Sequence, residues 1–291
     1  MKARLKRISK WILKGAGYIV VTILLAIAMK VFLFANFTVP TGSMEPAILA
    51  GDRIIVNKLI LGPRLYENFG FLNGKRTKLK RVRFIRKVRR NDILAFDFPY
   101  LIPNKIHQDG NEIYVKRCVA IPGDTFLIDN GFYRIKNFED TIGHVERQKR
   151  LSEMDETSFR ESIRYTFPND TLHYKWTIKN FGPLYIPAKG DNLSFDTVSV
   201  ILYKNLIEYE TEQKVTIREG HVLLGDSVIH DYTFQQDYYF MAGEWIFDSY
   251  DSRYWGLLPD DLVIGKATVI STSIDKDTGK YRKGRFLKII K

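Results

Sequence analysis

The sequence predicts a mostly β protein that is held to a membrane by one N-terminal helix. The chain contains 16 Tyr and 19 Phe, and β-branched residues recur along it, which favours strands beyond the N-terminal region. A basic N-terminus precedes a long uncharged apolar segment, the pattern of a membrane anchor. With 291 residues, 45% hydrophobic and 27% charged, the rest of the chain suits one or two folded domains.

The N-terminal segment has the length and flanking charge of a transmembrane helix. Residues 1–14 contain six basic residues and no acidic one, and residues 15–29 are uncharged and apolar. With the apolar residues that follow Lys30, about 23 residues can cross a hydrocarbon core of ~30 Å. Lys30 lies towards the far end and can extend to the interface. We therefore expect a cytoplasmic tail at 1–14, an anchor at 15–36 and a single pass, since no other run is long enough.

Two other interpretations of this segment remain open at the level of sequence. A cleaved signal peptide has a similar basic start and apolar centre. An amphipathic helix lying in the membrane interface would need a polar face, and residues 15–29 show little of one. The length of the apolar run favours a retained anchor, as does a serine motif that follows directly.

Alternating or apolar runs bounded by turn residues indicate strands in the remainder of the chain. A short helix is expected at 152–165, with Ser152 as its N-cap before an acid-rich first turn. The expected strands lie at 52–61, 92–100, 112–124, 172–180, 196–207, 219–225 and 261–271.

The net charge of +12 suits either nucleic acid or anionic lipid as a partner. The densest basic stretch, residues 75–90, has ten basic residues and no acidic one. No nucleic-acid-binding motif accompanies it, so a basic loop near an anionic membrane surface is favoured and no nucleic-acid partner is expected. The single cysteine, Cys118, rules out an internal disulfide and is interpreted as a small buried core residue.

A serine and a lysine are the candidates for chemistry. Ser43 lies in the turn sequence PTGSMEP and can act as a nucleophile only if another group takes its proton. The five histidines lie in polar or irregular surroundings without a convincing aspartate partner. A lysine can serve as the base if burial lowers its pKa from about 10.4. Lys116 is flanked by apolar residues in the strand 112–124, although an edge-strand lysine pointing to water fits the sequence equally well.

Four sequence blocks resemble, in order, the signatures of bacterial type I signal peptidases: PTGSMEP, GDRIIVNK, YVKRCVAIPGD and DSYDSRYWG. They fall within roughly 37–58, 92–124 and 239–270, behind the apolar segment. The resemblance implies a membrane-bound serine endopeptidase that removes signal peptides from exported preproteins after a small-x-small motif, without a metal or cofactor. It implies the bacterial inner membrane, with the catalytic domain on the periplasmic side. Membrane lipid and the export channel are further candidate partners.

The resemblance also assigns roles to individual residues. Ser43 matches the nucleophile, Lys116 the general base, and Ser249 the serine that orients the lysine amine. Thr41 matches the residue whose hydroxyl, together with the Ser43 N–H, forms the oxyanion hole. Structural support of the site is implied for Asp251, Ser252, Arg253, Arg117 and Glu244. The substrate pockets are implied to involve Phe37, Val39, Met44, Ile48, Ile54, Tyr114 and Val115.

One segment departs from the family pattern. The family has Gly-Asp-Asn shortly before the DSR element, whereas this chain has Gly243-Glu244-Trp245. Glu244 keeps a carboxylate that could pair with Arg117, but the amide is lost. The domain organisation implied by the family is an antiparallel β catalytic core at 37–128 and 236–274, an inserted β-rich lobe at 129–235, and a basic C-terminal tail at 275–291.

Two functions other than a peptidase also fit part of the sequence. A catalytically impaired relative could act as a membrane-bound binding protein, and the altered Gly243-Glu244-Trp245 segment is the only feature in its favour. A self-cleaving repressor uses a similar Ser/Lys pair on a related β fold. That class needs an N-terminal DNA-binding domain, and this chain has an apolar segment in its place.

Overall fold

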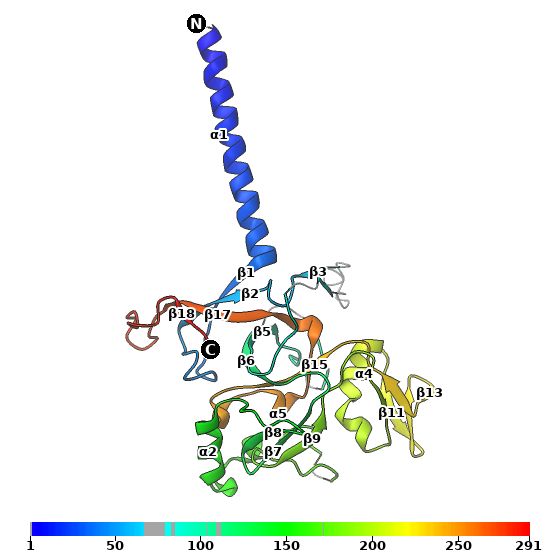
Figure 1. Cartoon of the computed structure of the whole chain (residues 1–291). Helices are drawn as coiled ribbons and strands as arrows, with labels where there is room; N and C mark the ends of the chain where they lie inside the picture. The colour runs from blue at the N-terminus through cyan, green and yellow to red at the C-terminus, as the bar shows by residue number, and fades with distance from the viewer. Residues whose placement is uncertain (1, 67–78, 83–84, 103, 109–111, 171) are drawn as a thin grey trace.

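One long helix projects from a body made mostly of β-sheet (Figure 1). The computed structural model describes residues 2–66, 79–82, 85–102, 104–108, 112–170 and 172–291. Helix α1 (Lys2–Ala28) continues into a π turn, η1 (Met29–Leu33), and strand β1 (Phe34–Thr38) follows at once. The last three residues of the expected anchor, 34–36, therefore pair in a sheet rather than continue the helix.

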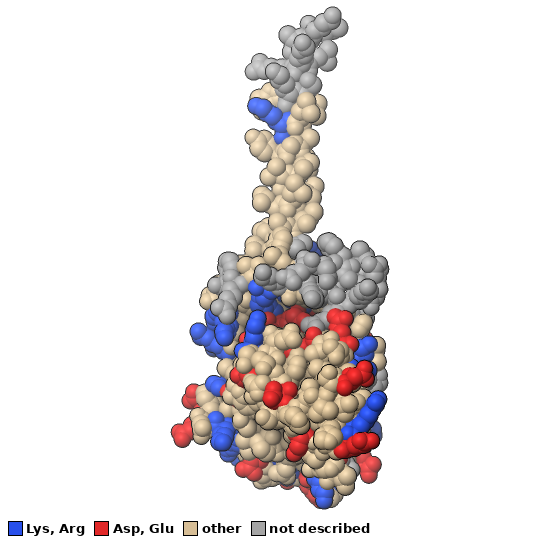
Figure 2. Space-filling model, turned by 90° about the vertical axis from the view of Figure 1, so that its right-hand side faces the viewer, with Lys and Arg blue, Asp and Glu red and all other residues tan. Residues whose placement is uncertain are grey.

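The apolar part of the projecting helix is exposed along its length. Within the part of the chain that the structure describes, Trp11–Ala28 is the one helix long and apolar enough to cross a membrane, and none of it is buried. On the face shown in Figure 2, its described part carries basic side chains only towards the outer end. So large an apolar surface is rare on a protein in water and suits a lipid environment.

The main sheet is antiparallel throughout. Lys116 lies on one of its strands, β6, and Ser43 lies in the loop that joins β1 to β2. The strand order is β1-β2-β17-β5-β6-β15-β16, with β18 also paired to β17. Register shifts at two points where β17 pairs with β2 let this long strand bend. Beyond β1, the strands are β2 (Asp52–Asn57), β5 (Ile93–Asp97), β6 (Ile113–Ala120), β15 (Tyr238–Ala242), β16 (Leu258–Pro259), β17 (Val263–Ser273) and β18 (Lys288–Ile289).

The chain between β6 and β15 forms smaller sheets and short helices on one side of the main sheet (Figure 1). The sheets are β8-β7-β9, β11-β12-β13 and the pair β10-β14. Their strands are β7 (Thr125–Asp129), β8 (Phe132–Ile135), β9 (Phe181–Tyr185), β10 (Asn192–Ser194), β11 (Val215–Arg218), β12 (His221–Leu224), β13 (Ser227–Val228) and β14 (Asp231–Thr233). The helices are α2 (Val145–Glu153), η3 (Glu156–Ser158), α3 (Glu161–Arg164), η4 (Ser199–Leu202) and α4 (Lys204–Thr211).

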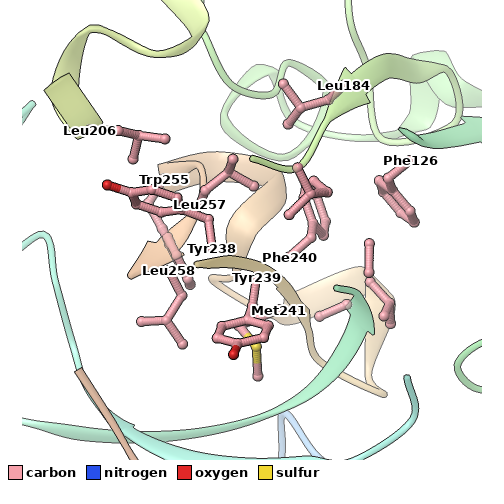
Figure 3. Packing of buried hydrophobic residues seen from close by; sticks show 14 of the residues in the cluster. Phe126, Leu184, Leu206, Tyr238, Tyr239, Phe240, Met241, Trp255, Leu257 and Leu258 are labelled. Atoms are coloured by element: carbon pink, nitrogen blue, oxygen red, sulfur yellow. The ribbon is translucent and has the colours of Figure 1, made fainter. Parts of the chain in front are cut away.

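Strand β15 connects the main sheet with the smaller sheets, because it belongs to the main sheet and its residues are buried on both faces. Phe240 of β15 packs on Phe126 of β7, with ring centres 4.3 Å apart. Figure 3 shows Phe126 and Leu184 on the Phe240 side of the strand, with Tyr239 and Met241 on the other side. Cys118 is also fully buried, which confirms its interpretation as a core residue. The remaining elements are β3 (Arg64–Tyr66), β4 (Leu79–Arg81), η5 (Ile246–Asp248), α5 (Ser252–Trp255) and η6 (Asp260–Leu262).

Several local expectations differ from the structure. The strand expected at 196–207 is instead η4 and α4, and 172–180 makes only an isolated bridge, between Thr177 and Tyr165. Ser152 lies in the last turn of α2 rather than capping a helix, and Asp155 caps η3. These differences arise where packing against the core outweighs local strand propensity.

The basic stretch 75–90 is only partly described, since residues 75–78 and 83–84 lie outside the described residues. Within the rest, Arg81 pairs with Asp260, Arg86 with Asp92 and Arg90 with Asp124. Three of the ten positive charges are therefore paired with acidic side chains of the protein.

Candidate active site

The site lies in a cleft of about 500 Å³ between the β1 side of the sheet and the start of β6. The loop between β1 and β2, residues 39–51, carries Ser43 and forms one wall; we call it the Ser43 loop. Strand β6 forms the second wall, and the segment after β15 closes one part of the cleft. The sequence-predicted residues that line the cleft are Phe37, Val39, Thr41, Ser43, Tyr114, Val115 and Lys116.

Lys116 meets Ser43 in this cleft. It lies on β6 opposite Leu94 of β5, and only 4% of it is exposed. Its Nζ is 2.6 Å from Ser43 Oγ. Burial lowers the pKa of Lys116 to about 8, while Asp251 and Asp248 act to raise it and Arg253 to lower it. A substantial fraction of the amine is therefore neutral near pH 8 and able to accept a proton.

The carbonyl of Ser43 accepts a hydrogen bond, whereas its N–H is not used by the residues that the structure describes. Trp245 N–H donates to Ser43 O at 3.0 Å, and Glu45 N–H donates to Gly42 O at 2.9 Å. Within the described ranges, Ser43 N–H donates no hydrogen bond. Thr41 is exposed and lines the same cleft. An N–H that has no hydrogen-bond partner among the described residues, on a residue that lines the cleft, is available to bind a developing oxyanion.

Ser249 lies close to the Ser43 backbone, with Gly243 between them. It is 5% exposed, and its Oγ makes no hydrogen bond with any residue that the structure describes. A Cβ on Gly243 would lie 2.0 Å from Ser249 Oγ and 2.8 Å from Ser43 O. Only glycine allows Ser249 and the Ser43 backbone to approach this closely, because the Cβ of any other residue at 243 would clash with both.

A fully buried ion pair supports this turn. Arg253 Nε and Nη2 donate to Asp251 Oδ1 and Oδ2, each at 2.8 Å, and neither residue is exposed. Asp251 Oδ2 also accepts the Gly243 N–H at 2.8 Å, and Ser252 Oγ accepts the Met241 N–H at 2.9 Å. Burial acts to raise the pKa of Asp251, but the Arg253 charge and hydrogen bonds hold it below its usual value.

The segment Gly243-Glu244-Trp245, which differs from the family pattern, makes specific contacts of its own. Glu244 Oε1 accepts from Arg117 Nε at 2.9 Å and also from Arg117 Nη2, and Glu244 Oε2 accepts the Ala47 N–H at 3.2 Å. The Trp245 ring lines the cleft and lies under the guanidinium of Arg147, 4.0 Å from ring centre to Cζ. The Glu244 carboxylate therefore pairs with Arg117 and also reaches the Ser43 loop, and Arg147 of α2 packs on the Trp245 ring.

Some predicted residues do not reach the cleft, and some that line it were missed. Met44, Ile48 and Ile54 are buried in an apolar cluster below the Ser43 loop, so any effect on substrate is indirect. The residues that line the cleft but were not predicted include Glu45, Ile113, Trp245, Asp248 and Tyr250. The only signal for them in the sequence was their position next to predicted residues. No group of three metal-binding side chains gathers within the described ranges.

A serine hydroxyl beside a buried lysine in an open cleft is typical of serine hydrolases that use a lysine base. The family model described as "Signal peptidase, peptidase S26" matches residues 9–272. The chain belongs to this family, which supports signal-peptide removal by a serine peptidase.

Individual relatives agree with the family match. A signal peptidase I of Buchnera aphidicola subsp. Acyrthosiphon pisum is 28% identical over 262 residues, covering 88% of this chain and 74% of the relative. The signal peptidase I of Haemophilus influenzae is 25% identical over 296 residues, covering 90% and 71%. A crystal structure of a signal peptidase I from Enterococcus faecalis V583 matches 63% of this chain and 98% of its own, with 19% identity and a TM-score of 0.30, too low to bear on the details.

Proposed function

We propose that this protein is a membrane-bound endopeptidase that removes signal peptides from exported preproteins, with Ser43 as nucleophile and neutral Lys116 as general base. The observation that carries the proposal is the 2.6 Å separation of Lys116 Nζ and Ser43 Oγ. The lysine is almost fully buried, and its pKa is lowered to about 8. A buried amine at this distance is in reach of the hydroxyl proton.

The reaction follows from this geometry. Ser43 Oγ attacks the scissile carbonyl carbon while Lys116 Nζ accepts the hydroxyl proton. The oxyanion is held by the Ser43 N–H and the Thr41 hydroxyl, donors that are worth on the order of 10²–10³ in rate each. The protonated lysine then donates its proton to the leaving amine, which leaves the signal peptide esterified to Ser43. Water, deprotonated by Lys116, hydrolyses this ester and releases the enzyme. The family resemblance alone assigns Ser249 the role of orienting the amine, since its Oγ makes no hydrogen bond with Lys116 or with any other described residue.

Apolar side chains in the wall of the cleft support the proposed preference for small substrate side chains. Phe37, Val39 and Val115 line the cleft together with the catalytic pair. The same walls keep water from Lys116, so substrate selection and activation of the base come from one feature.

The proposal is tested by mapping the cleavage site. The purified full-length protein in detergent, mixed with a preprotein, should release a mature protein whose new N-terminus follows a small-x-small motif. Replacing the alanine before the scissile bond by tryptophan should reduce cleavage by on the order of 10²-fold or more, because binding in the cleft is lost. Binding of preprotein without any turnover would favour the catalytically impaired alternative instead.

The lowered pKa of Lys116 predicts the pH dependence of cleavage. Since the neutral amine is the active form, kcat/KM should rise about tenfold per pH unit below pH 8 and level off above it. A profile of kcat/KM between pH 6 and pH 10 measures this directly. A rate that is flat across this range, or that falls through pH 8, would contradict a lysine base.

The proposed function places the protein in the bacterial inner membrane. Trp11–Ala28 spans the bacterial inner membrane once, with the basic N-terminus in the cytoplasm and the β body on the periplasmic side. The core 37–128 and 236–274 carries the site, and 129–235 forms the inserted lobe. Signal peptides and membrane lipid are the proposed partners, and the export channel is a further candidate.

A further inference from the structure

The Ser43 loop contains few regular hydrogen bonds of its own. Its ends are joined where Val39 N–H donates to Asp52 O and Gly51 N–H donates to Val39 O, at 2.8 and 2.9 Å. Between these ends, single turns such as Glu45 N–H to Gly42 O are its internal support. Residues 274–291, which we call the C-terminal segment, lie beside this loop, as the blue loop near the label C in Figure 1 shows.

Three basic side chains of the C-terminal segment donate to backbone carbonyls of the loop. Lys276 Nζ reaches Pro40 O at 2.7 Å, Arg285 Nη2 reaches Ala47 O at 3.0 Å, and Arg282 Nη1 reaches Ala50 O at 2.8 Å. These carbonyls lie on both sides of Ser43 in the chain. Charged donors make stronger hydrogen bonds than neutral ones, so the contacts restrain the loop on either side of the serine.

Arg285 makes the most extensive of these contacts. Its Nε and Nη2 donate to Asp52 Oδ1 and Oδ2 at 3.1 and 2.5 Å, and both residues are buried. Asp52 Oδ2 also accepts the Leu49 N–H at 2.8 Å. One guanidinium thus links the start of β2, the end of the loop and the Ala47 carbonyl.

The peptide groups of Ala47 are held from both directions. Its carbonyl accepts from Arg285, and its N–H donates to Glu244, which is paired with Arg117. Arg117 Nη2 in turn donates to Lys291 O at 3.1 Å, within the C-terminal segment. The contacts close a ring from the C-terminal segment through the Ser43 loop and Glu244 and back to the C-terminal segment.

We propose that the C-terminal segment is a clamp that positions the Ser43 loop, with Arg285 as its main positioning residue. Arg285 touches neither Ser43 nor Lys116 in this arrangement, and it acts through the loop backbone. The consequence for cleavage rests on the proposed function, because the distance that the clamp maintains is the one between Ser43 Oγ and Lys116 Nζ. A misplacement of about 1 Å at such a distance can lower a rate by about 10²-fold.

The test compares Arg285→Lys with Lys283→Ala in the full-length protein in detergent. Lysine keeps the charge of Arg285 but cannot donate to Asp52 and Ala47 together in the same geometry. Lys283 is exposed on the same segment and makes no hydrogen bond or ion pair within the described ranges. Arg285→Lys should speed hydrogen exchange of the loop amides at 42–49 by at least about tenfold, with β5 and β6 unchanged. It should lower kcat by about 10- to 100-fold with KM nearly constant. Lys283→Ala should change neither.

The two measurements separate the clamp from the proposed function. If the wild-type protein cleaves no preprotein, the proposed function fails, and the exchange experiment still tests the clamp. A uniform rise in exchange across the main sheet, with kcat per folded molecule unchanged, would show that Arg285 only stabilises the fold and would overturn the proposal. So would unchanged loop exchange. If Arg285→Lys does not fold, Arg282→Gln removes the donor to Ala50 O, together with the ion pair to Asp275 inside the C-terminal segment, and should show a smaller change of the same kind.

Discussion

Lys116→Met is expected to remove cleavage and to stabilise the folded protein at neutral pH. Methionine has a similar length and fits an apolar strand, but it cannot accept the Ser43 proton. Loss of a general base that acts together with its nucleophile costs on the order of 10⁴–10⁶ in kcat. Ser43→Ala should cause a loss of similar size, and the double variant should be little worse, since the two residues act as a unit.

The gain in stability follows from the pKa of Lys116. That pKa is about 8 in the folded protein against 10.5 for an exposed lysine. The unfolded chain therefore binds more protons between these values, so the stability of the wild type rises with pH through this window. Below pH 8 the wild type bears the full free-energy cost of burying the charged amine. This cost is roughly 3 kcal/mol, since each pKa unit corresponds to about 1.4 kcal/mol. After allowing for the lost contact with Ser43, Lys116→Met should gain about 2 kcal/mol at pH 7.

Thermal unfolding in detergent at pH 7 and at pH 10.5 measures this effect. The midpoint of Lys116→Met should exceed that of the wild type at pH 7, and the difference should nearly vanish at pH 10.5. Ser43→Ala is the control, because it removes the hydroxyl and leaves the buried amine in place. An equal difference at both pH values would mean that packing rather than charge explains it. Retained cleavage by Lys116→Met would remove the lysine from the mechanism.

Local patterns identified β2, β5, β6 and β17 of the main sheet because these strands are largely buried and apolar. They did not identify β1, β15, β16 or β18. The pattern failed at 196–207, where Val198, Val200 and Ile201 suggested a strand. Leu206, Ile207 and Tyr203 are buried at helical spacing there, and this face packs on the core as η4 and α4. The strand propensity of a short segment does not reveal which part of the protein will pack against its apolar side chains.

The site was predictable where its residues stand in compact sequence blocks. Ser43 and Lys116 could be named, but the distance between them could not, because 73 positions separate them in the chain. The C-terminal segment shows the limit more clearly. Its basic residues suggested an exposed tail, yet Arg285 is buried against Asp52, which is 233 positions away. No local pattern distinguishes an arginine that faces water from one that meets a distant carboxylate.

Asp251→Asn is expected to give the largest loss of stability among single substitutions near the site. It leaves the fully buried Arg253 without its counter-charge and weakens the acceptor of the Gly243 N–H. Removing one partner of a buried pair costs about 3–5 kcal/mol. The double variant Asp251→Asn/Arg253→Met should be less destabilised than additivity requires, because the unpaired charge is then absent.

Thermal unfolding with an exposed pair as control tests this expectation. Lys214 pairs with Glu208 at 2.8 Å, but its side chain is 74% exposed, so Lys214→Met should have little effect. A further effect is specific to the site. Asp251 acts to raise the pKa of Lys116 and Arg253 to lower it, so Asp251→Asn should shift the pH midpoint of any remaining cleavage below 8. An unfolding midpoint equal to that of Lys214→Met, or a pH midpoint that moves upward, would contradict the role of Asp251 as the counter-charge that supports this turn.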